Sequence, residues 1–379
     1  MDVLAVFPAV RSAARRDFAG RPLALHAIEQ AIAARKITRV AIVTSDAELV
    51  RLAEDAGVDV IAPPSRETPA DMLRAAIDGL GARERFAPLL ATILDPAFPM
   101  LTGDVIDAAI DELWRCGADS LLAVRPLAAA LWSQGGDGIA RPDDQSESER
   151  HYVETGALVA VRVGVFERTG ELPGGRVVLW PTSALAALRL EDDTEWPSIE
   201  VLYRASTAAR ARARLRDVRL LVLDFDGVMT DNRVLVFEDG REAVLCNRGD
   251  GMGLEMLKRS GLPVAVISKE VNPVVGARCK KLKIPYLQGI DNKLAELRRL
   301  VDDQGITLDA VAYVGNDVND AECMAAAGIA IAPSDAHPHA LRLAEIVTAL
   351  PGGFGAVREV CDALLATRAE TVETAKGPR

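Results

Sequence analysis

The chain has 379 residues, of which 49% are hydrophobic and 26% charged, and its formal net charge at pH 7 is −11. This length favours two domains, the acidic balance disfavours nucleic-acid binding, and no apolar run approaches the ~20 residues of a membrane span. The first residues lack the basic segment of a signal peptide, and the 5 scattered cysteines are typical of free thiols, so we expect a cytoplasmic protein.

Strands and helices alternate through residues 1–203, which predicts a first doubly wound parallel sheet of the α/β class. Apolar runs predict the strands, and amphipathic segments between them predict the helices. The predicted strands are Val3–Phe7, Val40–Thr44, Val58–Ile61, Leu89–Leu94, Ser120–Val124 and Ala157–Val161. The predicted helices are Leu23–Ala34, Glu48–Asp55, Ala70–Leu80 and Gly103–Cys116.

Short polar motifs accompany these elements. They are Phe7-Pro8-Ala9, Gly20-Arg21-Pro22-Leu23, Val43-Thr44-Ser45-Asp46, Glu154-Thr155-Gly156-Ala157 and Glu191-Asp192-Asp193-Thr194-Glu195. Their order resembles that of the N-acylneuraminate cytidylyltransferases, which transfer CMP from CTP to a sugar acid. The resemblance implies a Rossmann-type nucleotidyltransferase domain and CTP as a ligand.

The first loop departs from that family's phosphate loop. Where the family has glycines and a lysine, this chain has Pro8-Ala9-Val10-Arg11-Ser12-Ala13-Ala14-Arg15-Arg16, and backbone amides approach a phosphate less readily past Cβ atoms. An active cytidylyltransferase and a degenerate domain kept for binding or assembly therefore both stay open. The candidate remnants of a nucleotide site are Arg11, Arg15, Arg16, Glu191 and Asp193.

Residues 204–216 are rich in alanine and arginine, which predicts a helical connector between two domains. Residues 217–366 form the second predicted domain, and the polar residues 367–379 are expected to fray. In an acidic chain, the arginines of the connector are more typical of a solvated helix face than of a nucleic-acid site.

Two acidic motifs in the second domain follow predicted buried strands. Leu221-Val222-Leu223 precedes Asp224-Phe225-Asp226-Gly227, and Ala310–Gly315 precedes Asn316-Asp317-Val318-Asn319-Asp320. Ligands bind beyond the carboxyl ends of parallel strands, and alternation along an extended backbone sends Asp224 and Asp226 to the same side. Neighbouring carboxylates repel each other, and Mg²⁺ prefers oxygen ligands, so this pattern predicts a magnesium site.

A predicted strand, Leu262–Ile267, ends at Ser268, and Lys293 opens a predicted helix, Leu294–Leu300. The order of acid, hydroxyl, lysine and acid resembles the haloacid dehalogenase (HAD) phosphatases. The resemblance implies a nucleophilic Asp224 and a general acid–base Asp226. It implies phosphate contacts from Ser268 and Lys293, and a Mg²⁺ shell from Asp224, the Asp226 carbonyl and Asp317, oriented by Asp320.

The spacing between the first two HAD motifs leaves no room for a cap domain. Instead, Arg233–Leu245 predicts a hairpin around Asp239-Gly240. The later motifs Arg248-Gly249-Asp250-Gly251 and Pro351–Glu359 resemble the capless HAD group that includes 3-deoxy-manno-octulosonate-8-phosphate phosphatase. The resemblance implies a homotetramer built through the hairpins, with each tail near a neighbour's Asp224. The implied substrate-binding residues are Arg248, Asp250 and Asn316.

We therefore predict two doubly wound α/β domains, nucleotidyltransferase-like and then capless HAD-like. The predicted function is Mg²⁺-dependent hydrolysis of a phosphorylated keto-sugar acid of the nonulosonate or octulosonate type. The alternative is a cytidylyltransferase whose HAD domain serves tetramer assembly. A third hypothesis treats residues 1–203 as a scaffold or sensor.

Overall fold

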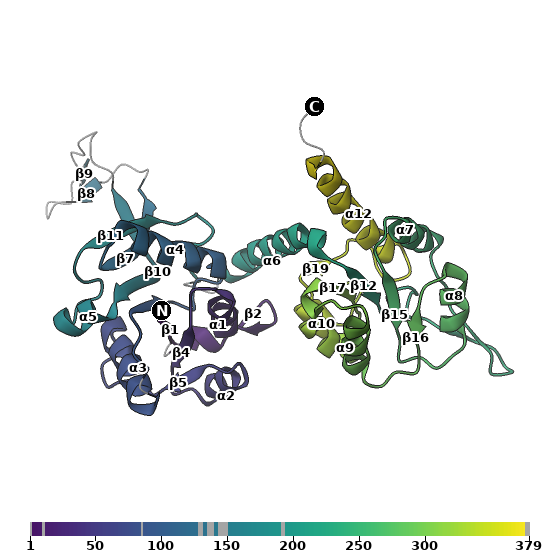
Figure 1. The fold of residues 1–379 in the computed structure, drawn as a ribbon, viewed down its shortest axis with the longest axis horizontal. Coiled ribbons are helices and arrows are strands. Elements are labelled where there is room, and N and C mark those ends of the chain that lie inside the picture. Colours follow the sequence, from purple (N-terminus) through teal and green to yellow (C-terminus); the bar gives the residue numbers. More distant parts are fainter. Residues whose placement is uncertain are drawn as a thin grey trace. The chain divides into compact units, whose positions relative to one another are not determined.

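The computed structural model describes residues 2–9, 12–84, 86–127, 132–134, 140–142, 151–190 and 194–375. The chain divides into two compact units, Met1–Tyr203 (unit 1) and Arg204–Arg379 (unit 2) (Figure 1). Within the described part of the chain, no helix combines the length and the apolar character that a membrane span requires.

Unit 1 contains a seven-stranded sheet in the order β11-β7-β10-β6-β1-β4-β5. Its strands are β1 (Val3–Pro8), β4 (Arg39–Val43), β5 (Asp59–Ile61), β6 (Leu90–Leu94), β7 (Ser120–Pro126), β10 (Tyr152–Arg162) and β11 (Val177–Pro181). Its helices are α1 (Leu23–Ala33), α2 (Ala47–Asp55), α3 (Pro69–Glu84), α4 (Gly103–Cys116) and α5 (Val163–Thr169). Two short pairs, β2 (Asp17–Phe18) with β3 (Arg21–Pro22) and β8 (Trp132–Gln134) with β9 (Ala140–Pro142), lie outside this sheet.

The burial of strand β1 on both faces explains why its residues are apolar throughout. Val3, Ala5 and Phe7 belong to one core cluster, which also includes residues of α1 and α4. Leu4 and Val6 belong to another, which includes residues of α3 and α5. A strand covered by helices on both faces buries every side chain, so its sequence reads as a continuous apolar run.

The α/β class is confirmed, but the sheet of unit 1 is not parallel throughout. Strand β10 runs antiparallel to both of its neighbours, β6 and β7. Helix α4 connects β6 to β7, and β10 occupies the position that this crossover leaves between them. Strand β11, at the edge of the sheet, and helix α5 were not predicted.

Unit 2 contains a six-stranded parallel sheet in the order β16-β15-β12-β17-β18-β19. Its strands are β12 (Leu220–Leu223), β15 (Val264–Ile267), β16 (Tyr286–Leu287), β17 (Val311–Val314), β18 (Ile329–Ala332) and β19 (Ile346–Val347). The helices are α7 (Arg248–Arg259), α8 (Val274–Leu282), α9 (Lys293–Asp303), α10 (Ala321–Ala326), α11 (Pro338–Leu343) and α12 (Ala356–Ala375).

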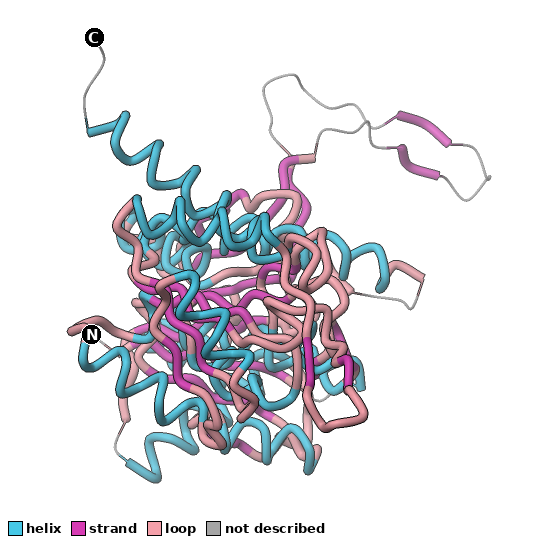
Figure 2. Tube along the Cα trace, turned by 90° about the vertical axis from the view of Figure 1, so that its right-hand side faces the viewer, coloured by secondary structure: helices cyan, strands magenta, loops and turns pink. Residues whose placement is uncertain are grey.

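Two helix layers cover the sheet of unit 2. The core cluster on one face draws on α7, α8 and α12, and the cluster on the other face draws on α9, α10 and α11. Both views show α12 leading away from the sheet toward the C-terminus (Figure 1, Figure 2).

The predicted helical connector is part of a longer helix, α6 (Trp196–Arg214), which begins before residue 204. The predicted hairpin is present as β13 (Leu235–Val236) and β14 (Glu242–Ala243). Its turn includes Gly240 at a φ of 82°, in the left-handed region that favours glycine.

Candidate active site

Neighbouring strands bring the two acidic motifs to one edge of the unit 2 sheet. Strands β12 and β17 pair in parallel with Leu223 opposite Val314, and the Asp224 amide donates a hydrogen bond to the Val314 carbonyl at 2.9 Å. Strand β15 lies on the other side of β12 and ends one residue before Ser268. The residues that follow these three strands therefore share the carboxyl edge of the sheet.

Lys293 joins the two acidic motifs. It opens α9, whose N-cap residue Asn292 accepts a hydrogen bond from the Ala295 amide. Its Nζ lies 2.9 Å from Asp224 Oδ1 and 2.8 Å from Asp320 Oδ1. All three side chains are buried, with relative exposures of 3% for Lys293, 4% for Asp224 and 0% for Asp320. A buried ion pair of this kind is stable only when its remaining polar atoms also find partners.

Asp320 meets that condition. Its Oδ1 also accepts a hydrogen bond from the Tyr313 hydroxyl at 2.8 Å. Its Oδ2 accepts hydrogen bonds from the amides of Asn316 at 2.9 Å and Asp317 at 3.4 Å. Protein donors thus engage both oxygens of Asp320, and its expected part in orienting the Mg²⁺ shell stays a prediction.

The site carries more acid than Lys293 neutralises. Burial and then the charge of Asp320 raise the pKa of Asp224 to about 8, against the opposing effects of Lys293 and the Phe225 amide. Burial is also the main cause that raises the pKa of Asp226, with Glu270 adding to it and the Thr230 hydroxyl opposing it. Burial alone would lower the pKa of Lys293, but its two carboxylate partners outweigh burial and raise it. A further cation would relieve this imbalance.

Asp226 is half-buried, and its Oδ1 accepts a hydrogen bond from the Thr230 hydroxyl at 3.2 Å. The same hydroxyl accepts hydrogen bonds from the amides of Gly227 and Asn232. Thr230 therefore orients Asp226 within the turn that follows β12. Sequence reasoning missed this role, although a hydroxyl four residues after the acid was a visible signal.

Ser268 is buried, and its Oγ accepts a hydrogen bond from the Glu270 amide at 3.1 Å. Asp317 is partly exposed, and its Oδ1 accepts a hydrogen bond from the Val318 amide. Among the residues that the structure describes, no three His, Cys, Asp or Glu side chains lie close enough together to hold a metal ion. The expected metal ligands are nevertheless all oxygen atoms, which suit Mg²⁺. The Mg²⁺ shell therefore stays a prediction that the structure does not test.

Comparison with known proteins identifies the family of the chain. No protein-family model matches the chain. The chain is 39% identical over 171 residues to the 3-deoxy-D-manno-octulosonate 8-phosphate phosphatase of Escherichia coli strain B, which is 45% of this chain and 90% of the relative. The chain belongs to the family of 3-deoxy-D-manno-octulosonate 8-phosphate phosphatases. It is therefore a HAD phosphomonoesterase.

Two solved structures of this phosphatase family are also similar to the chain. That from Yersinia pestis has 36% identity and a TM-score of 0.41, and covers 42% of this chain and 87% of its own. That from Moraxella catarrhalis, in complex with magnesium, phosphate and a KDO molecule, has 31% identity and a TM-score of 0.41, and covers 44% of this chain and 97% of its own.

The expected substrate-binding residues of this phosphatase differ in their surroundings. Asp250 is only 1% exposed, and its Oδ1 accepts a hydrogen bond from the Arg358 amide at the start of α12. This hydrogen bond ties α7 to α12, and the expected contact of Asp250 with substrate stays a prediction. Arg248 is exposed and without a hydrogen bond or ion pair among the described residues, so it remains a candidate.

Asn316 lies against the turn after β12. It is 6% exposed, and a Cβ placed on Gly227 would come within 1.9 Å of its Nδ2. Gly227 has a φ of 74°, so glycine is required there both by conformation and by space.

The segment Pro351–Glu359 also reaches this turn, but within its own chain. The Gly353 amide donates a hydrogen bond to the Val228 carbonyl at 3.1 Å, and a Cβ on Gly352 would lie 2.0 Å from the Gly227 carbonyl oxygen. The expectation placed this segment near the site of a neighbouring subunit. Glycines allow the segment to pack on the turn after β12 of its own chain, and its approach to a neighbouring subunit stays a prediction.

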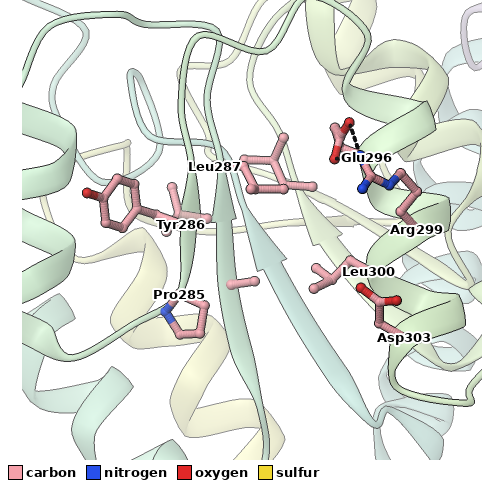
Figure 3. Close-up of a pocket in the computed structure, with 10 residues that line it drawn as sticks. Pro285, Tyr286, Leu287, Glu296, Arg299, Leu300 and Asp303 are labelled. Carbon is pink, nitrogen blue, oxygen red and sulfur yellow. Dashed lines mark hydrogen bonds and ion pairs between the residues drawn. The ribbon is translucent and has the colours of Figure 1, made fainter.

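A separate pocket of about 200 Å³ lies between the β15–β16 edge of the sheet and α9 (Figure 3). Pro285, Leu287 and Leu300 make much of its wall apolar, and Glu296 and Arg299 form an ion pair of 3.1 Å beside it. It includes none of the residues of the candidate active site.

In unit 1, three of the expected nucleotide-site remnants, Arg11, Glu191 and Asp193, lie outside the described residues. Arg15 Nη1 lies 3.3 Å from Asp46 Oδ2, and the Arg16 guanidinium lies 4.1 Å from the centre of a Trp196 ring. The described remnants are thus directed toward protein groups. A cytidylyltransferase site stays untested.

Proposed function

We propose that unit 2 hydrolyses the phosphate monoester of an eight-carbon 3-deoxy keto-sugar acid, of the 3-deoxy-D-manno-octulosonate 8-phosphate type. The observation that carries this proposal is the position of Lys293 between Asp224 and Asp320. A buried ammonium that neutralises only part of two carboxylates suits a site whose substrate brings further negative charge and whose cofactor brings positive charge. The match over 90% of a relative with this substrate in its name supports the choice of sugar acid.

Asp224 is proposed as the nucleophile. Its carboxylate oxygen forms a bond to phosphorus while the bond from phosphorus to the sugar oxygen breaks, which gives an aspartyl phosphate. Asp226, which the Thr230 hydroxyl orients, gives its proton to the departing sugar oxygen. Asp226 then takes a proton from the water that attacks phosphorus, the bond from phosphorus to the Asp224 oxygen breaks, and inorganic phosphate leaves a free Asp224 carboxylate.

Lys293 and Ser268 are proposed to bind the phosphoryl oxygens, because their polar atoms are buried at the same edge of the sheet. Asp224, the carbonyl of Asp226 and Asp317 would hold Mg²⁺. When bound, the ion would offset negative charge on the phosphoryl oxygens and on the clustered carboxylates.

The hairpin β13–β14 and its flanks expose the apolar residues Val234, Leu235, Val236 and Phe237. Exposed strand edges with apolar side chains are a liability unless another chain covers them. This supports the proposal that hairpins meet in a homotetramer and help to exclude water from the open site.

For unit 1 we propose a nucleotidyltransferase-like domain that does not turn over CTP. The first loop lacks the glycines and the lysine of the related family, and Arg15 is already paired with Asp46.

A screen of sugar-acid phosphates tests the main proposal. We expect the highest kcat/KM for an eight-carbon 3-deoxy keto acid phosphate, with activity lost on chelation of divalent cations and restored by Mg²⁺. Equal kcat/KM for simple alkyl phosphates would contradict the substrate assignment.

A further inference from the structure

Tyr313 is the largest fully buried side chain among the residues that the structure describes, and its hydroxyl contacts an acid of the candidate active site. On β17, Val311 and Tyr313 face the core cluster under α9, α10 and α11, whereas Ala312 and Val314 face the opposite cluster. Tyr313 is thus part of an apolar core, with relative exposure 0%. A phenylalanine would fill the same space, so the hydroxyl needs an explanation of its own.

The hydroxyl donates to Asp320 Oδ1 at 2.8 Å, which is the same oxygen that Lys293 Nζ contacts at 2.8 Å. The other oxygen of Asp320 is fixed by backbone amides of the loop after β17. The carboxylate is therefore held by two amides, one ammonium and one neutral hydroxyl. The hydroxyl belongs to a side chain of the core cluster under α9, α10 and α11.

Lys293 divides its charge between two carboxylates. Its distances to Asp224 and Asp320 are nearly equal, 2.9 and 2.8 Å. Without the Tyr313 hydroxyl, Asp320 Oδ1 would keep only Lys293 as a side-chain donor. The balance would then shift toward Asp320, because an underbonded buried carboxylate attracts the nearest cation more strongly.

We propose that Tyr313 is a positioning residue of the phosphatase site. By donating to Asp320, it keeps Lys293 available to Asp224 and to the phosphoryl group. Tyr313 touches neither substrate nor the reacting atoms and acts through Asp320. The proposal rests on the phosphatase activity of unit 2 but not on the identity of its sugar.

The test is a double-mutant cycle with Tyr313→Phe and Asp320→Asn, measured as kcat and KM for p-nitrophenyl phosphate. Loss of a hydrogen bond to a charged group predicts that Tyr313→Phe lowers kcat about tenfold and changes KM less than about twofold. In the Asp320→Asn background, the same change should alter kcat less than about twofold, because a neutral amide at residue 320 no longer competes with Asp224 for the charge of Lys293.

Val301→Ala is the matched control. Val301 lies in the same core cluster but outside the polar network, so this variant should lower the melting temperature and leave kcat unchanged. An unchanged kcat in folded Tyr313→Phe, or an equal tenfold effect in both backgrounds, would overturn the proposal. Should Tyr313→Phe fail to fold, 3-fluorotyrosine at position 313 keeps the hydroxyl and alters its donor strength; an unchanged kcat there would also overturn it.

Asp224→Asn distinguishes this proposal from the function itself. If Asp224→Asn abolishes hydrolysis while Tyr313→Phe has no effect, only the positioning role fails. If Asp224→Asn hydrolyses the ester at the wild-type rate, the proposed function fails.

Discussion

The side chain of Asn316 packs directly on Gly227, so that a Cβ at residue 227 would lie 1.9 Å from the Asn316 Nδ2 atom. This contact joins the loop after β17 to the turn after β12. The two loops carry all four acids of the candidate site, and their separation is therefore set by the absence of a side chain at one residue.

Gly227→Ala is expected to lower activity more than tenfold, because Asn316 must move and take its loop with it. The left-handed backbone adds a strain of roughly 1–2 kcal/mol to the free energy of folding. Gly261→Ala is the control, since Gly261 also has a positive φ, 84°, but no atom within 4 Å of a Cβ. It should show a similar loss of stability by urea unfolding with normal kcat. Full activity in Gly227→Ala would contradict the close approach.

Asp224→Asn keeps the shape of the side chain and removes the nucleophilic carboxylate. Turnover of a generic phosphate ester should fall by several orders of magnitude. Because Asp224 is also a source of buried negative charge, the variant should not melt below the wild type. Steady-state assays and differential scanning calorimetry measure both effects, and wild-type turnover would rule out the assigned nucleophile.

Stability around Asp250 should depend on pH. Burial raises the pKa of this carboxyl above its ordinary value of 3.8, against the Arg358 amide, and its Oδ2 has no hydrogen-bond partner among the described residues. A raised folded-state pKa stabilises the fold below the unfolded pKa, and this contribution is lost as pH rises through the folded-state pKa. Asp250→Asn keeps an acceptor for the Arg358 amide but cannot ionise.

The melting temperature of Asp250→Asn relative to wild type should therefore increase as the pH is raised from 4 to 7. The exposed Asp302→Asn on α9 provides the control and should show no such trend. A difference that falls with rising pH would show that the Asp250 carboxylate is stabilised, not destabilised, by its surroundings.

The exposed hairpin predicts assembly. Replacing Val236 with lysine, or deleting residues 234–244, should yield species smaller than a tetramer in light scattering, with impaired phosphatase activity. Val201→Lys, which charges another exposed apolar site, should leave the assembly unchanged. A fully active wild-type monomer of 40.5 kDa would exclude the tetramer.

Calorimetric titration with CTP and Mg²⁺ tests unit 1. We expect no saturable heat at millimolar CTP, because the first loop lacks the glycines that would let amides surround a phosphate. Saturable binding with release of pyrophosphate would establish the cytidylyltransferase alternative.

Sequence reasoning works best where a residue's surroundings are decided locally. The continuous apolar run at Leu221–Leu223 and the acids after it indicate a buried strand ending at a ligand site. Strand β12 confirms the first part of this expectation, and the ligand site stays a prediction. The direction of a strand, in contrast, is not decided locally. The apolar run at Ala157–Val161 predicts a buried strand but not the antiparallel direction of β10. A strand that is buried on both faces has the same apolar pattern whether it is parallel or antiparallel to its neighbours.

Contacts between segments that are distant in the chain could not be predicted from the sequence either. The motif around Asp250 is compatible with a surface loop, and only the approach of α12 buries its carboxylate. Tyr313 reads as one more apolar residue of a strand, since nothing local reveals that its hydroxyl meets Asp320. In the sequence, the glycines at 352 and 353 indicate a turn. In the structure, they allow the chain to pack closely on residues 227–230.

That packing has a consequence for the order of events during synthesis. Strand β12 leaves the ribosome before either of its sheet neighbours, β15 and β17, and the turn that follows it receives its covering segment only from residues 351–355. Unit 1 is complete by then, and domains generally fold as they emerge, N-terminal first. A chain halted before residue 351 would hold every proposed catalytic side chain yet lack the segment that packs on the backbone of the turn after β12, so the site would be fully packed only after residues 351–355 had joined it.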